Sequence, residues 1–190
     1  MDTVEFILQA QQGWFGRIRP YLLGSNLNVG SGHGFFSRIA RTAGIAMTSL
    51  DVAVPDEAVD RADVVLYDGA AMPFADRSYD VSVAMYVLHH TPSPEALLRE
   101  MRRVSRTRIV LVEELYRHKP GKVRLAILDF LVNFRAGLKS KIHWNSYLNA
   151  ARLLKAVEQG GWKLVYSDST RKAGFDEVLW VVDAPPENLG

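Results

Sequence analysis

The fold of this chain is decided by one stretch of sequence, Leu27-Asn28-Val29-Gly30-Ser31-Gly32-His33-Gly34. Its apolar start is typical of a buried strand, and its three glycines alternate with other residues. Because glycine has no side chain, such a turn lets the backbone approach a ligand closely where a strand passes into a helix. A nicotinamide-dinucleotide fingerprint would need a third glycine where Phe35 stands. The turn therefore predicts a ligand-binding loop, and it disfavours without excluding a nicotinamide-dependent oxidoreductase.

Strand and helix patterns alternate on both sides of this loop, which favours an α/β fold with a parallel sheet. We expect strands at 27–29, 46–51, 64–67, 80–85 and 109–112. We expect helices at 4–15, from the glycine loop to Ala43, and at 94–105, with a short helix after Pro55. A last helix is expected at 146–159, with Asn145 as its N-cap. Two further strands, 162–167 and 177–182, are separated by too few residues for a crossover helix. The last pair must therefore be antiparallel.

Length and composition exclude several classes of protein. We expect residues 1–190 to form a single domain, and the absence of cysteine excludes disulfides, cysteine-bound zinc, iron–sulfur clusters and thiol nucleophiles. A formal charge of +2 gives no reason to expect nucleic-acid binding. The acidic start, and the lack of any apolar run near the roughly 18 residues that span a bilayer, predict a cytoplasmic protein.

Acidic side chains follow the second and third predicted strands. Asp51 ends the second strand, where a carboxylate can accept hydrogen bonds from both hydroxyls of a ribose. Asp68 ends the third, followed by Gly69 and Ala70, where an acid can accept from an exocyclic adenine amine. Parallel strands present their carboxyl ends at one edge of the sheet, and doubly wound folds bind their ligands there. We expect these residues to share that edge with the glycine loop.

The run from Asp68 to Val81, DGAAMPFADRSYDV, is followed by Val87-Leu88-His89-His90, and together these resemble the class I S-adenosylmethionine-dependent methyltransferases. The likeness is closest to the quinone-biosynthesis and small-molecule subgroup. It extends from Leu27 to about Glu114, with the motifs in order. The resemblance implies a doubly wound, Rossmann-like sheet of seven strands in the order 3-2-1-4-5-7-6, the last strand antiparallel. It also implies S-adenosylmethionine as cofactor and direct methyl transfer from its sulfonium to a small molecule.

The resemblance also assigns roles to residues by position. The three glycines would lie along the methionine part of the cofactor, and Asp51 would hold its ribose. Asp68, Gly69 and Ala70 would contact the adenine. Met85 and Tyr86 would border the sulfonium. The cofactor-binding set is then Asn28, Gly30, Ser31, Gly32, Gly34, Asp51, Val52, Asp68, Gly69, Ala70, Met85 and Tyr86. Asn28 departs from the family, which more usually has an acid there, and Ser105 to Arg108 replace a glycine-containing turn. Asn28 keeps open the alternative of a methyltransferase-like subunit that binds a partner and has lost catalysis.

Three residues are candidates for catalysis. His89 and His90 titrate near neutral pH and could act as general bases, and Glu113 could orient an acceptor hydroxyl or amine. Each has a simpler interpretation: in the resembling family the histidine pair is a common structural feature, and Glu113 with Glu114 could be solvated acids at a strand end. A sulfonium already carries a good leaving group, so no base is obligatory. His33 and His118 lack partners at metal-ligand spacing, and we predict no metal site.

The segment 116–145 lies between the fifth strand and the final helix, where the resembling family commonly inserts elements that cover the substrate. It holds seven Lys or Arg against Asp129 as its single acid, and it has a broad apolar surface. We expect it to be a helical lid and residues 1–24 to be an N-terminal helical cap. The acceptor would then be an apolar molecule bearing an acidic group, or the lid would rest on an anionic membrane surface. Packing and a solvated rim would also explain the pattern. The sequence predicts no oligomeric state.

Overall fold

A seven-stranded sheet in the order β3-β2-β1-β4-β5-β7-β6 forms the centre of the molecule. The computed structural model describes residues 3–135 and 143–185. The strands are β1 (Ser25–Val29), β2 (Ala46–Asp51), β3 (Val64–Leu66), β4 (Tyr79–Met85), β5 (Ser105–Tyr116), β6 (Lys163–Arg171) and β7 (Phe175–Asp183). The order matches the one that the family resemblance implies.

The first five strands are parallel, and β7 runs antiparallel to both of its neighbours. Only residues 172–174 join β6 to β7, which is far too short for a crossover helix. The prediction of an antiparallel final pair is therefore confirmed. The strand order reverses between β1 and β4, because β1 leads outward to β2 and β3 while β4 leads to β5. A doubly wound sheet binds ligands at the carboxyl end of the strands at such a switch point.

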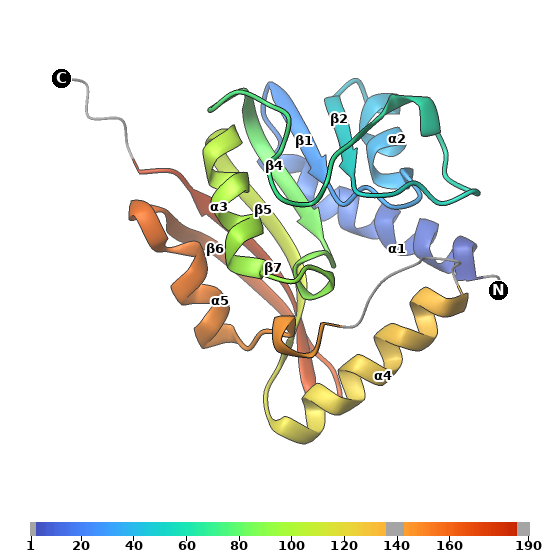
Figure 1. Ribbon diagram of the computed structural model, residues 1–190, viewed down its shortest axis with the longest axis vertical. Coiled ribbons are helices and arrows are strands. Elements are labelled where there is room, and N and C mark those ends of the chain that lie inside the picture. The colour runs from blue at the N-terminus through green and yellow to red at the C-terminus, as the bar shows by residue number, and fades with distance from the viewer. Residues whose placement is uncertain (1–2, 136–142, 186–190) are drawn as a thin grey trace.

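Helices cover both faces of the sheet (Figure 1). α1 (Thr3–Ile18) and α2 (Phe35–Thr42) lie on one face, where Trp14, Ile18 and Phe36 pack on the buried side chains of β4 and β5. α3 (Pro94–Val104) and α5 (Ala150–Val157) lie on the other face. The central strands are therefore buried between two helical layers, and their carboxyl ends are free to position a site.

α4 (Lys119–Arg135) belongs to neither layer, and Figure 1 shows it beyond the ends of β5 and β7. Leu125 and Ala126 pack with Tyr147 and Phe175 in a separate small apolar cluster. The apolar side chains on the rest of the helix are largely exposed: Val123, Ile127, Leu128, Phe130, Leu131, Val132 and Phe134. Within the described residues, no helix combines the length and apolar character that crossing a bilayer needs. Of the predicted lid 116–145, residues 136–142 lie outside the described residues.

Several predicted boundaries were wrong. α1 continues through Gly13 and Gly16 to Ile18, because a buried tryptophan and isoleucine hold its last turns against the sheet. The residues after Pro55 form turns and a short 3-10 turn instead of an α-helix. β3 is an edge strand that ends at Leu66, one residue earlier than predicted, and the side chain of Leu66 is exposed.

The remaining corrections concern the second half of the chain. The side chain of Asn149, not Asn145, caps α5 by accepting from the backbone N–H of Arg152. β5 is much longer than predicted, because β7 pairs with it as far as Tyr116. The predicted loop before β5 is part of this strand: Arg106 pairs with Asp80, and the strand begins at residue 105.

Candidate active site

The glycine loop leaves the end of β1 and lies against the end of β2. The backbone N–H groups of Gly30 and Ser31 donate to the carbonyl of Leu50 at 2.8 and 3.1 Å. Gly30, Gly32 and Gly34 have φ angles of 69°, 52° and 79°, in the left-handed region that side chains disfavour. The alternating glycines therefore give the chain a path from strand to helix that other residues would adopt only with strain.

The three glycines have different surroundings. A Cβ at Gly30 would stand 2.5 Å from a methyl of Val87, and one at Gly34 would stand 2.7 Å from the carbonyl oxygen of Val59. At Gly32, by contrast, no atom of the described residues lies within 4 Å of the Cβ position. Gly30 and Gly34 therefore serve close packing within the protein, while the Gly32 backbone presents a bare surface that a ligand can approach.

Asp51 binds directly to this loop. One oxygen of its carboxylate accepts from the N–H of Gly32 at 2.7 Å, and the other accepts from Val52 N at 2.7 Å and Ala53 N at 3.3 Å. Burial raises the pKa of Asp51, and the backbone donors oppose that effect. The structure thus brings the predicted ribose ligand and the predicted cofactor loop into contact at the carboxyl edge of β1 and β2.

Asn28, near the end of β1, and Ser31, within the loop, are both buried. The amide of Asn28 donates to Ser37 Oγ at 2.9 Å, and Ser49 donates to the same oxygen at 2.8 Å. The nitrogen of the Asn28 amide is therefore directed to α2, and a cofactor ammonium would need the other end of the amide, Oδ1, as its acceptor. Ser31 differs, because its buried hydroxyl has no hydrogen-bond partner among the described residues. A buried hydroxyl without a partner beside a bare glycine is a site at which a polar ligand fits.

The predicted adenine residues lie at the end of β3. Asp68 is exposed and accepts from Ala70 N at 2.8 Å, which folds the chain into a turn through Gly69, with φ 84°. A Cβ at Gly69 would lie 3.3 Å from a methyl of Val52, whose side chain is itself exposed. The ends of β2 and β3 therefore offer an apolar contact and an acid next to each other, as an adenine ring with its amine requires.

Met85 and Tyr86, at the end of β4, have different surroundings. Met85 is buried in the core beneath α1 and α2, so only its backbone can border the sulfonium. Tyr86 has a left-handed φ of 56°, and its N–H donates to Val112. Its hydroxyl accepts from Trp14 Nε1 and donates to Glu177, both at 2.7 Å, and burial followed by the Glu177 charge raises the pKa of Tyr86. Tyr86 thus joins α1 to β7 beside the cofactor edge.

Glu113 and His89 form a buried pair where β5 passes the short turn Leu88–His90. His89 Nδ1 lies 2.5 Å from one oxygen of Glu113, and the other oxygen accepts from Leu88 N at 3.0 Å. Both side chains are about 1% exposed. The interpretation of Glu113 and Glu114 as solvated acids at a strand end is therefore wrong, because β5 continues past them. Burial raises the pKa of Glu114 to about 7.

Asp129 of α4 completes this cluster. One carboxylate oxygen, Oδ1, lies 3.4 Å from Nε2 of His89 and 3.4 Å from Nε2 of His90. The same oxygen accepts from Asn133 Nδ2 at 2.6 Å, and Oδ2 accepts from the hydroxyl of Tyr147 at 2.8 Å. The two predicted histidines and Glu113 are therefore brought together, and α4 contributes a fourth member.

The two histidines titrate in opposite directions. Burial opposes the charged form of His89, but the carboxylates of Glu113 and Asp129 outweigh it and raise the pKa of His89 to about 10. Burial, with the neighbouring charge of His89, lowers the pKa of His90 to about 4. Near neutral pH, His90 is therefore the neutral imidazole and His89 carries the charge.

Sequence reasoning missed Asp129 and Tyr147 as members of the site. The available signal was that Asp129 is the single acid of an otherwise basic and apolar segment, one helical turn from Leu125 and Asn133. A lone acid on the inner face of a predicted helix is costly unless it has a partner. Tyr147 had no comparable signal, because it lies in an irregular segment.

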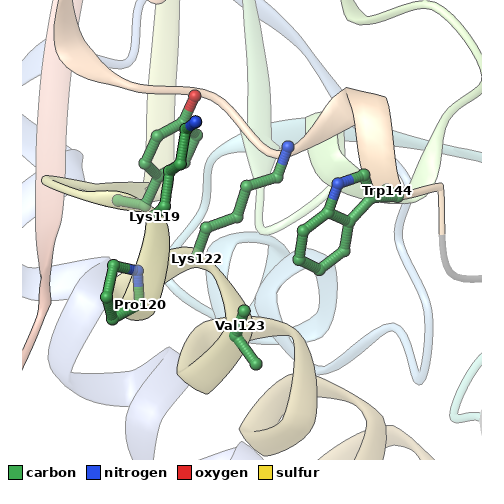
Figure 2. Close-up of a pocket in the computed structure, with 6 residues that line it drawn as sticks. Lys119, Pro120, Lys122, Val123 and Trp144 are labelled. Atoms are coloured by element: carbon green, nitrogen blue, oxygen red, sulfur yellow. The ribbon is translucent and has the colours of Figure 1, made fainter.

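A pocket of about 460 Å³ lies at the first turn of α4, shown in Figure 2. It is lined by Tyr116, Lys119, Pro120, Lys122, Val123 and Trp144. The ammonium of Lys122 lies 5.3 Å from the ring centre of Tyr116 and 4.6 Å from that of Trp144, and burial lowers the pKa of Lys122. None of the predicted cofactor residues lines this pocket. It is an aromatic, basic hollow distinct from the glycine loop.

Comparison with known proteins agrees with this geometry. Residues 27–112 match a family model described as a methyltransferase domain. An uncharacterized methyltransferase of Mycobacterium avium is 36% identical over 87 residues, which cover 42% of this chain and 34% of that protein. The chain thus spans about a third of the length of that relative.

Two solved structures share the fold. A SAM-dependent methyltransferase from Methanosarcina mazei superimposes with a TM-score of 0.69 and 17% identity, covering 90% of this chain and 97% of that one. Magnesium protoporphyrin IX methyltransferase from Synechocystis, solved with bound SAH, gives a TM-score of 0.62 at 15% identity and covers 95% and 83%. The strand order, the glycine loop in contact with Asp51 and the matched domain together make this chain similar to the class I S-adenosylmethionine-dependent methyltransferases.

Proposed function

We propose that this chain transfers the methyl group of S-adenosylmethionine to a small-molecule acceptor. The observation that carries the proposal is the contact of Gly32 with Asp51 at the switch point of the sheet, beside the Ser31 hydroxyl, for which the described part of the chain offers no hydrogen-bond partner. When bound, the sulfonium supplies a methyl carbon that a lone pair of the acceptor attacks while the sulfur keeps the electrons of the broken bond. The protein's task is to hold the cofactor and the acceptor in alignment, and this alignment can lower the barrier to methyl transfer by roughly 7–11 kcal/mol.

Each part of the cofactor has a matching feature in the chain. The bare Gly32 backbone and the Ser31 hydroxyl suit the amino-acid part, Asp51 suits the ribose hydroxyls, and the Val52–Gly69 contact with Asp68 suits the adenine. The Asn28 amide N–H is committed to Ser37. The acceptors that remain for the cofactor's amine are then the amide oxygen of Asn28 and the backbone carbonyls of the loop.

The acceptor would lie between the cofactor edge and α4. His89, His90 and Asp129 lie where β4 and β5 meet this helix, and the second half of the helix leaves its apolar side chains uncovered. Lys119 and Lys122, at its first turn, provide positive charge. These features support an apolar acceptor that bears an acidic group, with residues 116–145 acting as its lid.

Enzymatic turnover tests the proposal. Purified protein would be incubated with S-adenosylmethionine and a panel of apolar phenols and carboxylic acids, and release of S-adenosylhomocysteine would be followed by mass spectrometry. We expect acceptor-dependent release that Asp51→Ala strongly reduces. Cofactor binding without release for any acceptor would instead favour a methyltransferase-like binding subunit, and absence of cofactor binding would contradict the assignment.

The lid has a separate test. Replacing Lys119, Lys122 and Arg124 together by Gln should weaken binding of an acidic acceptor, while cofactor affinity stays unchanged. Cosedimentation with phosphatidylglycerol and with phosphatidylcholine vesicles, at low and raised salt, addresses the membrane alternative. Binding to the anionic vesicles alone, lost with added salt and in the triple variant, would favour a membrane surface over a small acceptor.

A further inference from the structure

We propose that His89, His90 and Asp129 bind a divalent transition-metal ion. One ligand atom from each of the three lies within 4.8 Å of the others, and both imidazole Nε2 atoms are 3.4 Å from the same Asp129 oxygen. Zinc–nitrogen and zinc–oxygen bonds of about 2.0–2.1 Å place tetrahedral ligands about 3.3–3.4 Å apart. The observed separations to the carboxylate already have that value. This proposal replaces the prediction of no metal site, which considered only His33 and His118.

The strongest support for a metal site is the environment of the His89 ring. Its side chain is fully buried, and Nε2 makes no hydrogen bond of acceptable geometry to any described residue. The other ring nitrogen, Nδ1, is held by Glu113. A carboxylate on one imidazole nitrogen orients the ring, as it does for histidine ligands of metals. Nε2 of His89 therefore faces the Asp129 oxygen, and an ion bound between them would displace the Nε2 proton that His89 carries near neutral pH.

Hydrogen bonds also orient the carboxylate of Asp129. Tyr147 holds one of its oxygens and Asn133, one turn further along α4, holds the other. The hydrogen bonds fix the carboxylate plane and leave the second lone pair of Oδ1 directed to the two imidazoles. A carboxylate that is already oriented loses little entropy when it binds an ion.

Charge favours a dication here. Asp129 and Glu113 place two carboxylates around the imidazoles, and within residues 3–135 and 143–185 neither acid is paired with a Lys or Arg. Two imidazoles and a carboxylate suit zinc, cobalt(II) or iron(II) better than magnesium or calcium, which prefer oxygen ligands. Three protein ligands leave a fourth position open, as in catalytic metal sites. The proposal concerns metal binding itself and does not rest on methyl transfer.

Metal titration tests this proposal. Protein stripped with EDTA and desalted would be titrated with Zn²⁺ by calorimetry, and its Co²⁺ complex would be examined for the visible absorption of a tetrahedral site. We expect one ion per chain and a tetrahedral cobalt spectrum, with Mg²⁺ giving no heat. Asp129→Asn and His90→Gln, which retain side-chain volume, should abolish specific binding. Glu113→Gln, which alters the group that orients His89 but removes no metal ligand, should weaken it by about 10–100-fold.

His118→Gln is the matched control, because His118 is exposed on the chain just before α4 and lies outside the cluster. It should bind zinc like the wild type. Circular dichroism would establish that every variant is folded. If the wild type binds no zinc above the level of Asp129→Asn, or if His118→Gln weakens binding as much as His90→Gln, the cluster is a buried ion pair and the proposal is wrong.

Discussion

Asp51 is the residue on which the cofactor assignment depends most directly. Asp51→Ala removes the acceptor of the Gly32 N–H as well as the predicted ribose ligand. We expect cofactor binding to weaken by about 1–3 kcal/mol, the usual cost of leaving polar partners without hydrogen bonds. Calorimetric titration with S-adenosylhomocysteine measures the change. Asp56→Ala is the control, because that side chain is 94% exposed and, among the residues that the structure describes, forms an ion pair with Arg61 alone. Equal effects of the two substitutions would contradict the assignment of Asp51 to the ribose.

Gly32 and Gly44 form a second matched pair. Both have positive φ, 52° and 77°, and at neither does a described residue lie within 4 Å of the Cβ position. Replacement by Ala should therefore cost each protein a similar free energy of unfolding, on the order of 1–2 kcal/mol from backbone strain alone. Only Gly32→Ala should also weaken cofactor binding, because only its Cβ would face the ligand. Normal cofactor affinity in Gly32→Ala would show that the loop is only a tight turn and does not bind the cofactor.

At the residue scale, the sequence predicted the cofactor edge better than the catalytic cluster. Gly32 and Asp51 could be predicted because each occupies a fixed place relative to a strand end. The side-chain direction of Asn28 could not, because it depends on Ser37, which the fold brings beneath it. Asp129 reaches His89 only through the placement of α4.

At the scale of elements, the anchoring of α4 can be tested at its first turn. A Cβ on Gly121 would lie 2.0 Å from the carbonyl oxygen of Gly174, in the turn between β6 and β7. Gly121→Ala should therefore destabilise the protein by about 1–3 kcal/mol, because backbone must move. Gly16→Ala, within α1 where the Cβ meets nothing among the described residues, should stabilise it by up to about 1 kcal/mol. Urea denaturation gives both values; a neutral Gly121→Ala would mean that α4 is not held there.

The segment before β3 carries a pH-dependent contact. Arg38 and Arg41 of α2 donate hydrogen bonds to Asp60. These bonds lower the pKa of the Asp60 carboxyl to about 2, and the one from Arg38 has the larger effect. Because the unfolded chain has the higher pKa, near 3.8, the contact stabilises the native state above about pH 4 and is lost as the pH falls towards 2. Solvent exposure limits the effect to less than about 1 kcal/mol.

Asp60→Asn tests this contact. The difference in unfolding free energy between the variant and the wild type should be largest near pH 5 and should shrink by pH 3. Urea titrations at the two pH values measure it, and a difference that does not change with pH would show that the arginines do not stabilise Asp60 through its charge.

The elements themselves were predicted where periodicity and end signals agreed, as for α3 and β4. α1 was cut short because glycines at 13 and 16 resemble a stop signal, although burial of Trp14 and Ile18 outweighs their low helix propensity. The length of β5 could not be read from the sequence, because its polar ends are strand only through pairing with β7.

At the scale of the whole molecule, the sheet order followed from the resemblance, and the antiparallel ending followed from a connection too short for a crossover helix. The candidate site combines residues from β1, β2, β5, α4 and the turn Leu88–His90. Strand-end spacing predicted the members from β1 and β2, but no spacing along the chain predicts that α4 joins them. α4 also explains why the molecule has an open, apolar side beside a closed core. The proposed acceptor and the proposed metal both depend on where this one helix lies.

Calorimetric titration of the purified wild-type protein with S-adenosylhomocysteine tests the central claim most directly, since it needs neither the acceptor nor the metal. The account predicts a saturable isotherm with one ligand per chain, and an unfolding free energy that rises by about 2.7 kcal/mol when free ligand is one hundred times its dissociation constant. Absence of saturable heat in a folded protein, or an isotherm that Asp51→Ala and Gly32→Ala leave unchanged, would contradict a cofactor site at the carboxyl edge of β1 and β2.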